Sequence, residues 1–374
     1  MPPRLKKLTS YEFWRTGLGG RIPPAFDLVK SRRLAGLPVK SAPDWQALIQ
    51  DILDPLIPEN SQVALFDFPN YSNVGDSAIW LGEEAYLRRR EDLSLTVVED
   101  CGVRHRRLPE LRPSAVVLIQ GGGNLGDLWP HHQALRETIV GHYQNQRIIQ
   151  LPQSIYFGEP INEERSRRIF GAHGDFHLLV RDQASLEWGQ RLHDGPTQLC
   201  PDMALCLGPL SRTREPSHDI VALLRTDKET ATSNGSREHM RDAVIADWLE
   251  EPSSLIRRIT RRFERLQSEY PRRLASLYGI KRRLYHRLAR ERLQRGCDIL
   301  SSGRVVITDR LHAHILCTLM DIPHVVLDNS YRKIGNFRDA WETGAGLCET
   351  ASNLVEANSK AGKLLGAFPV GSAS

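Results

Sequence analysis

The chain has 374 residues, of which 40% are hydrophobic and 25% are charged, and its formal net charge is +5. This composition is ordinary for a globular protein and leaves room for about two domains. It excludes a largely disordered chain, and no run of about 18 apolar residues predicts a membrane-spanning helix.

The cysteines and the first residues indicate where the protein works. Six cysteines are scattered along the chain without a C-x-x-C pair, and most lie in apolar segments. They are typical of reduced core residues, so we expect a cytoplasmic protein without disulfides. Residues 1–7 are basic, but no apolar signal core follows them, which argues against secretion. We treat residues 1–60 as an N-terminal extension in which 44–53 has the pattern of a short helix.

Apolar runs alternate with helical patterns over residues 61–210. Strands are expected at 63–68, 95–99, 115–120, 147–151 and 177–180, with a short extended piece at 199–205. Helices are expected at 78–90, 133–142 and 162–170, and a further one opens at 181–185. The uninterrupted apolar run at 115–120 is typical of a strand buried on both faces. Strands and helices alternating at this spacing predict a parallel sheet covered by helices.

A polar break at 208–218 precedes a second segment of the same kind. Strands are expected at 219–224, 305–308 and 324–327, helices at 241–249 and after residue 310, and a polar loop at 230–236. The chain therefore reads as two similar α/β halves, 61–210 and 211–374. A ligand site in the cleft between them follows from this arrangement.

The second half contains a strongly basic segment, 255–295. Apolar residues recur there at three- and four-residue spacing, and arginine and lysine fill the other faces, which predicts a helical insert. A solvated or domain-bridging helical pair, a face lying on an anionic membrane and a nucleic-acid surface all fit this pattern. The segment has no nucleic-acid motif, so nucleic acid is not expected as a partner.

Two loops of the first half contain residues suited to ligand binding. Asn73-Val74-Gly75-Asp76 lies at the first strand-to-helix turn, where glycine permits close backbone approach and Asp76 either caps the helix or acts on a substrate hydroxyl. Gly121-Gly122-Gly123 follows the central strand and offers backbone N–H groups to a ligand. It matches neither the dinucleotide-binding pattern nor the P-loop. A capped turn and a tight turn without ligand are the simpler alternatives.

Three arginines stand at the ends of expected strands, namely Arg181, Arg225 and Arg310. A single arginine is usually a surface ion pair, but three at equivalent strand ends suit a small acid that carries carboxylate and phosphate. His312 opens the helix after Arg310, where a helix N-terminus favours anions, and it titrates near neutral pH. His314 lies roughly 200° around that helix, so the two histidines do not share a metal ion. We expect no metal.

These motifs, in this order, resemble those of the polysaccharide pyruvyl transferase family. The matching elements, which lie between about residues 63 and 340, are Asn73-Val74-Gly75-Asp76, Gln120-Gly121-Gly122-Gly123-Asn124, Leu151-Pro152-Gln153-Ser154, Val180-Arg181-Asp182, Cys200-Pro201-Asp202-Met203-Ala204 and Asp309-Arg310-Leu311-His312-Ala313. The resemblance implies two Rossmann-like domains facing across a cleft in a glycosyltransferase-B-like arrangement. It also implies transfer of a pyruvyl group from phosphoenolpyruvate to two sugar hydroxyls, which gives a cyclic ketal in exopolysaccharide or cell-surface polysaccharide biosynthesis.

The resemblance further implies roles for single residues. Arg181 and Arg310 would contact the donor, His312 would serve as acid or base, and Asp76 would lie in the site as a second catalytic group. For substrate binding we add, from the strand-end and loop arguments, Arg225, Asn73, Gly122, Gly123 and Asn124. No cofactor is required by this chemistry. We expect a lipid-linked oligosaccharide as acceptor, which would give segment 255–295 a reason to touch the inner face of the plasma membrane.

Two other functions fit parts of the sequence. A glycosyltransferase of the same architecture would use a nucleotide sugar, but no clear carboxylate for the ribose is present. A non-enzymatic basic adaptor would act through 255–295 and leave Arg310 and His312 dispensable. The polar residues at strand ends in both halves argue against the adaptor.

Overall fold

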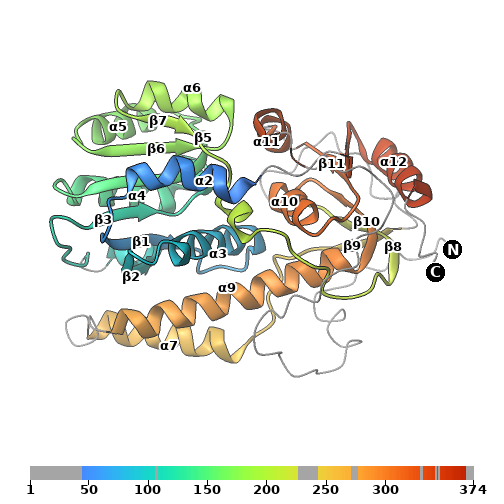
Figure 1. Cartoon of the computed structure of the whole chain (residues 1–374), viewed down its shortest axis with the longest axis horizontal. Helices are drawn as coiled ribbons and strands as arrows, with labels where there is room; N and C mark the ends of the chain where they lie inside the picture. Colours follow the sequence, from blue (N-terminus) through green and yellow to red (C-terminus); the bar gives the residue numbers. More distant parts are fainter. Residues whose placement is uncertain are drawn as a thin grey trace.

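The computed structural model describes residues 44–105, 108–225, 243–270, 277–328, 332–341, 343 and 346–367. Within them, two parallel β-sheets are flanked by helices, as Figure 1 shows. The α/β class expected from the alternating pattern is confirmed. The polar loop expected at 230–236 and most of the N-terminal extension lie outside the described residues.

The larger sheet has the strand order β2-β1-β3-β5-β6-β7, and β4 pairs with β5 beside this path. All of its pairings are parallel. The central strands are buried along most of their length, as expected when helices cover both faces. The strands are β1 (Gln62–Phe68), β2 (Ser94–Asp100), β3 (Val116–Ile119), β4 (Gly122–Gly126), β5 (Arg147–Tyr156), β6 (Phe176–Val180) and β7 (Thr197–Leu199).

The helices around the larger sheet begin at side-chain caps in several places. The carboxylates of Asp44 and Asp182 and the amide of Asn73 accept hydrogen bonds from first-turn N–H groups. The elements are α2 (Trp45–Leu53), η1 (Asp54–Leu56), α3 (Val74–Arg89), η2 (Cys101–His105), α4 (Pro130–His142), α5 (Pro160–Gly171), α6 (Gln183–Leu192) and η3 (Met203–Leu207). The short helix expected at 44–53 is confirmed.

The smaller sheet has the order β12-β11-β10-β8-β9, again with parallel pairing throughout. Its strands are β8 (His218–Leu223), β9 (Ala243–Ala246), β10 (Gly303–Thr308), β11 (His324–Leu327) and β12 (Cys348–Ala351). The helices of this part are α7 (Leu255–Glu269), α9 (Tyr278–Ser301), α10 (Leu311–Leu319), α11 (Lys333–Trp341) and α12 (Leu354–Ala367). The six cysteines are all free thiols, and four of them are buried.

Two local predictions were wrong, and two of the alternatives considered for the loops do not hold. The piece expected to be extended at 199–205 is in a strand only at Leu199, and the 3-10 helix η3 begins at Met203, where Asp202 accepts from the N–H of Ala204. The helix expected at 241–249 is strand β9 where it is described, since Val244 and its neighbours pair with β8. Gly122–Gly126 forms strand β4 against β5 rather than a simple turn. Helix α3 starts at Val74, so Asn73, not Asp76, is its cap.

Helix α9 joins the two sheets. It contacts α3 and β2 on one side and β8, β10 and α10 on the other, and Figure 1 shows it running beneath both sheets. A Cβ atom on Gly296 would collide with Val74, so glycine allows α9 to approach the start of α3 closely. Arg292 and Arg295 are buried and donate to the carbonyls of Pro69 and Ser72, each at 2.7 Å. Helix α9 therefore braces the loop that leads into α3.

Candidate functional site

The strand order reverses at one point in each sheet. In the larger sheet, β2 lies on one side of β1 and β3 on the other. In the smaller sheet, β9 lies on one side of β8 and β10 on the other. Parallel sheets place ligands beyond the carboxyl ends of their strands at such points. The loops that follow these four strands carry the Asn73–Asp76 turn, the 121–124 glycines, Arg225 and Arg310.

Helices α3 and α10 meet at Gly75 and His312. A Cβ atom on Gly75 would collide with the His312 side chain at Nδ1, Cγ and Cβ, so only glycine leaves room for the histidine at this place. Nε2 of His312 lies 3.3 Å from Oδ2 of Asp202. The structure thus brings the Asn73–Asp76 turn and His312 together.

Asp202 lies at the centre of the site. It is fully buried, accepts from Nη1 of Arg181 at 2.6 Å, and also contacts His312. Burial alone would raise the pKa of this carboxyl, but the charge and hydrogen bond of His312 and the charge of Arg181 outweigh it and hold the pKa well below its ordinary value. Because an ionised carboxylate only accepts, Nε2 of His312 is the donor in its bond with Asp202.

Arg181 extends from the end of β6 to the glycine loop. Its Nε donates to Ser154 at 2.9 Å, and a Cβ atom on Gly123 would lie 2.8 Å from its Nη2. Nζ of Lys333, from the start of α11, lies 3.4 Å from the carbonyl oxygen of Gly123. Two cations from different halves of the chain therefore lie over the same glycine, and Lys333 was not among the residues expected from the sequence.

Asp76 lies across from the same loop. Asn73 donates through Nδ2 to its Oδ2 at 2.7 Å, and Asn73 also caps α3 by accepting from Gly75. Gly122 has a φ of +132°, which an L side chain adopts only with strain, and a Cβ atom there would lie 3.8 Å from Oδ1 of Asp76. The predicted residues Asn73, Asp76, Gly122 and Gly123 are therefore adjacent.

Asn124 is held inside a network behind this loop. Its amide oxygen accepts from Nη2 of Arg136 at 2.8 Å and from Nε2 of Gln153 at 2.9 Å. Its own N–H donates to Oε1 of Gln153 at 3.0 Å. Burial lowers the pKa of Arg136 to about 10. The contacts of Asn124 fix the shape of the loop.

The other two strand-end arginines have different neighbours from Arg181. Nη2 of Arg310 lies 3.3 Å from Oδ1 of Asp247, and its guanidinium carbon lies 5.6 Å from the centre of the Trp248 ring. The backbone N–H of Arg225 donates to Asp309 at 2.8 Å. The structure thus joins Arg181 to His312 through Asp202, while the contacts described for Arg310 are on the side of β9.

His314 faces away from this site, as its position on the helix predicts. It is buried, its Nδ1 lies 2.7 Å from Nε2 of His324, and its Nε2 lies 2.7 Å from Thr343. Burial lowers the pKa of His324 to about 4, and burial together with the charge of His324 lowers that of His314. His314 is a core histidine.

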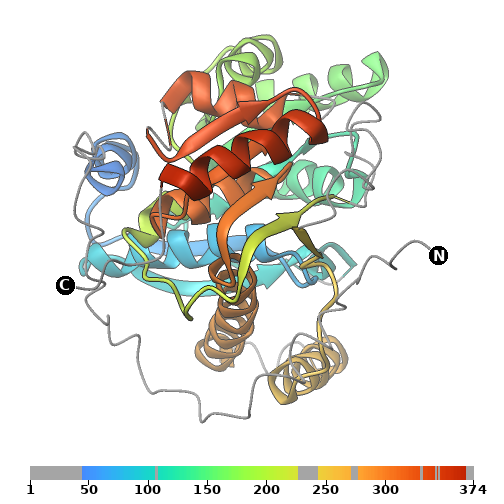
Figure 2. The same ribbon diagram turned by 90° about the vertical axis from the view of Figure 1, so that its right-hand side faces the viewer.

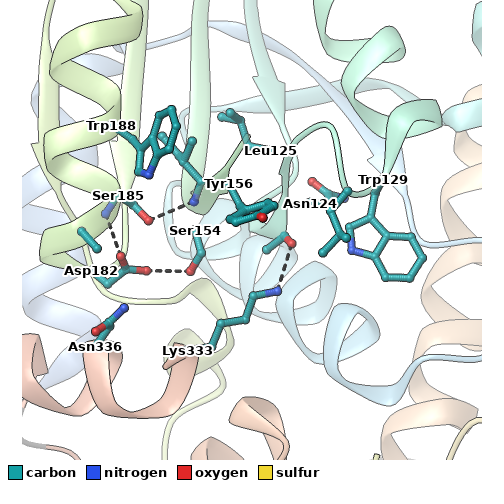
Figure 3. Close-up of a pocket in the computed structure, with 14 residues that line it drawn as sticks. Asn124, Leu125, Trp129, Ser154, Tyr156, Asp182, Ser185, Trp188, Lys333 and Asn336 are labelled. Atoms are coloured by element: carbon teal, nitrogen blue, oxygen red, sulfur yellow. Dashed lines mark hydrogen bonds between the residues drawn. The ribbon is translucent and has the colours of Figure 1, made fainter. Parts of the chain in front are cut away.

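A cavity of about 150 Å³ opens beside Gly123 and Lys333 (Figure 3). Trp129, Tyr156 and Trp188 surround it, and the polar side chains of Ser154, Asp182 and Asn336 lie at its floor and edge. Ser154 donates to Asp182 at 2.6 Å. The pocket was not predicted from the sequence. Its aromatic residues Trp129 and Tyr156 lie soon after β4 and at the end of β5, a strand that is longer than expected.

The family model for polysaccharide pyruvyl transferases matches residues 73–331, well over half of the chain. The chain belongs to the polysaccharide pyruvyl transferase family. It is therefore an enzyme of pyruvyl transfer in polysaccharide biosynthesis, and the resemblance seen in the sequence is confirmed. The match runs from the cap of α3 to beyond β11, so it includes Asp76, Arg181, Asp202, Arg310 and His312 but ends before Lys333 and Asn336 of α11.

Relatives of this pyruvyl transferase occur in bacteria and yeast. The chain is 33% identical over 304 residues to the putative pyruvyl transferase EpsO of Bacillus subtilis, covering 79% of this chain and 90% of that one. It is 31% identical over 328 residues to pyruvyl transferase 1 of Schizosaccharomyces pombe, covering 81% and 75% respectively. A crystal structure of an uncharacterised Klebsiella pneumoniae protein shares the fold, with 17% identity and a TM-score of 0.51 over 81% of this chain and 96% of that one.

Proposed function

We propose that this pyruvyl transferase takes its pyruvyl group from phosphoenolpyruvate and forms a cyclic ketal on two hydroxyls of a sugar. The observation that carries the proposal is the buried Asp202 bonded to both Arg181 and His312, beside a glycine loop. The Asp202 carboxylate therefore contacts both Arg181, which would bind an anion, and His312, which would transfer a proton. In this proposal, the enzyme is cytoplasmic and acts in surface-polysaccharide assembly.

The donor carries a carboxylate and a phosphate, and the site offers matching groups. Arg181 and Lys333 lie over Gly123, and the α3 N-terminus adds backbone N–H groups and a favourable dipole. Arg310 and Arg225 complete the donor site in our proposal. Since Arg310 now pairs with the carboxylate of Asp247, donor binding would exchange that partner for the anion.

The proposed reaction uses His312 and Asp76 as proton carriers. A protonated His312 gives its proton to the terminal carbon of the enol, which becomes the methyl group and leaves a cation-like centre at the neighbouring carbon. A sugar hydroxyl forms a bond to that carbon, and Asp76 takes the hydroxyl proton. The carbon–oxygen bond to phosphate then breaks, phosphate leaves with the bonding pair and takes up the proton held by Asp76, and a cation-like centre forms again at the same carbon. The second hydroxyl closes the ketal, and its proton restores His312.

We propose that the aromatic cavity receives the acceptor sugar. The faces of Trp129, Tyr156 and Trp188 suit the apolar faces of a sugar ring, while Ser154, Asp182 and Asn336 suit its hydroxyls. The cavity adjoins Gly123, so a bound sugar would place hydroxyls next to the proposed donor. A lipid-linked oligosaccharide remains the acceptor that we propose.

The two parallel sheets also support a glycosyltransferase-B-like pair of Rossmann-like domains, 61–210 and 211–374. The strands of the larger sheet end at Leu199 and those of the smaller one begin at His218. A nucleotide-sugar glycosyltransferase of this architecture is the second candidate. It needs a carboxylate placed for a ribose, whereas the charges found here suit a small dianion.

Thermal unfolding with added ligands tests the proposal. Phosphoenolpyruvate should raise the midpoint, and UDP-sugars should not, because only a ligand of the native state stabilises it. Arg181→Met should abolish the shift, whereas Arg147→Met, at an exposed ion pair with Asp175, should keep it. A shift with UDP-sugars alone would favour the glycosyltransferase.

A further inference from the structure

Helix α7 presents its apolar stripe to solvent. Leu255, Ile259 and Leu266 are 65%, 42% and 40% exposed, and Tyr270, which caps the helix, is 49% exposed. On a helix of 3.6 residues per turn, these four positions fall within roughly 60° of one another. Of the nine large apolar side chains exposed in the described residues, four therefore form a single stripe.

The opposite face of α7 attaches the helix to the protein largely through polar groups. Thr260 and Gln267 are the buried residues of this helix. Glu264 accepts from Tyr285 Oη at 2.9 Å and from Asn70 at 2.8 Å. An amphipathic helix normally turns its apolar face to the core, so the outward stripe needs another explanation.

Arginines line one flank of the stripe. Arg258, Arg262 and Arg265 are exposed and lie within roughly 80° of Leu255 around the helix axis. None of the three pairs with an acidic side chain among the described residues, and Glu269 is the acidic residue of α7 on this side. Figures 1 and 2 both show α7 at the periphery of the molecule, beyond α9 from the sheets.

We propose that α7 is a docking face for an anionic lipid bilayer. The apolar stripe would lie among the headgroups and upper acyl chains, and the arginines would bind lipid phosphates. This assigns the membrane contact considered for residues 255–295 to α7, because most apolar residues of α9 are buried and its exposed apolar residue, Ile280, stands apart from the stripe. The inference does not depend on the donor or the acceptor.

Sedimentation of the full-length protein with vesicles tests the proposal. The protein should pellet with phosphatidylcholine vesicles that contain phosphatidylglycerol, should remain in solution with phosphatidylcholine alone, and should bind less as salt rises. Replacing the stripe by Leu255→Ser, Ile259→Ser and Leu266→Ser should abolish binding. Replacing Arg258, Arg262 and Arg265 by Gln should weaken it on the order of a hundredfold, or roughly fivefold per arginine.

Helices α5 and α12 supply the matched controls. Arg165, Arg167 and Arg168 of α5 are exposed, as are Ile161 of α5 and Val355 of α12. The corresponding Arg→Gln triple variant, and Ile161→Ser combined with Val355→Ser, should bind vesicles as the wild type does. All variants should keep the wild-type melting midpoint, since the altered side chains face solvent.

Three outcomes would overturn the proposal. One is equal sedimentation of the stripe variant and the wild type. Another is binding of a DNA duplex that depends on the α7 arginines but not on the stripe, together with no binding to vesicles, which would indicate a nucleic-acid surface. A third is self-association that the stripe variant abolishes while vesicles bind neither form, which would assign the stripe to a second copy of the chain.

Discussion

His312 at the start of α10 and Asp202 at the start of η3 are 110 residues apart in the chain, and their side chains lie 3.3 Å apart. The pair joins helix α10, which follows strand β10 of the smaller sheet, to the end of the segment that forms the larger sheet. Asp202 also holds Arg181 at 2.6 Å, so one buried carboxylate fixes both functional side chains.

Loss of the carboxylate should destabilise the protein strongly. Asp202→Ala leaves Arg181 buried and unpaired, which typically costs about 3–5 kcal/mol of unfolding free energy. Asp175→Ala breaks the partly exposed pair with Arg147 and should cost less than about 1 kcal/mol. Urea unfolding measures both. Equal effects would mean that the central ion pair is not buried in the native protein.

A methyl group at position 75 should reduce activity by displacing His312. Gly75→Ala should lower kcat by about 10²-fold, in the range expected for a misplaced general acid. Gly141→Ala in α4, where a Cβ atom meets nothing within 4 Å, should leave kcat unchanged and stabilise by up to about 1 kcal/mol. The double variant Gly75→Ala/His312→Ala should be no slower than His312→Ala alone. Additive losses in that cycle would show that Gly75 acts on something other than His312.

Lys333 should affect donor binding more than turnover. Lys333→Gln removes one of the two cations over Gly123, and we expect KM for the donor to rise about tenfold with a smaller change in kcat. Lys360→Gln, in an exposed pair with Glu356, is the matched control and should change neither constant. Steady-state kinetics of phosphate release would measure both, and an unchanged KM in Lys333→Gln would remove this lysine from the site.

The buried His314–His324 pair should make stability fall in mild acid. Burial lowers the pKa of His324 to about 4, whereas an unfolded histidine titrates near 6.5. Between these values the unfolded chain binds more protons, so the stabilisation is complete above about pH 6.5 and is lost as pH falls toward 4. This difference in pKa corresponds to roughly 3 kcal/mol of unfolding free energy for His324.

Denaturant unfolding between pH 7 and pH 4 would measure the slope of the unfolding free energy against pH. His324→Asn should flatten it, and His142→Asn, which changes an exposed histidine, should leave it as in the wild type. A slope that survives in His324→Asn would mean that other groups carry the acid sensitivity.

The sequence predicted those parts of the fold that depend on local pattern. Strand β10 and helix α10 lie where the apolar run and the Thr-Asp-Arg-Leu-His turn indicate, and Arg310 stands at the junction. The same reasoning failed for Ala243–Ala246. The spacing of apolar residues there indicates a helix, the β-branched residues favour a strand, and pairing with β8 makes the segment a strand. Local pattern carries no information about that pairing.

The site could be predicted only in part for a similar reason. Asp202 was present in a recognised motif, but its role depends on Arg181 and His312, which are distant in sequence. Lys333 reaches the glycine loop from another helix, and nothing in its own neighbourhood signals this. The outward stripe of α7 was also hidden, because periodicity marks an apolar face without saying whether the core or the solvent receives it.

The most direct test of the proposed chemistry follows the proton that His312 is to deliver. Wild-type enzyme, phosphoenolpyruvate and a candidate acceptor would be incubated in heavy water, and the product examined by NMR and phosphate assay. We predict a ketal whose methyl group carries one deuterium, phosphate release in equal amount, and a rate lower by roughly 10²–10⁴-fold in His312→Ala. Normal ketal formation by that variant, or transfer from a nucleotide sugar instead, would contradict the account.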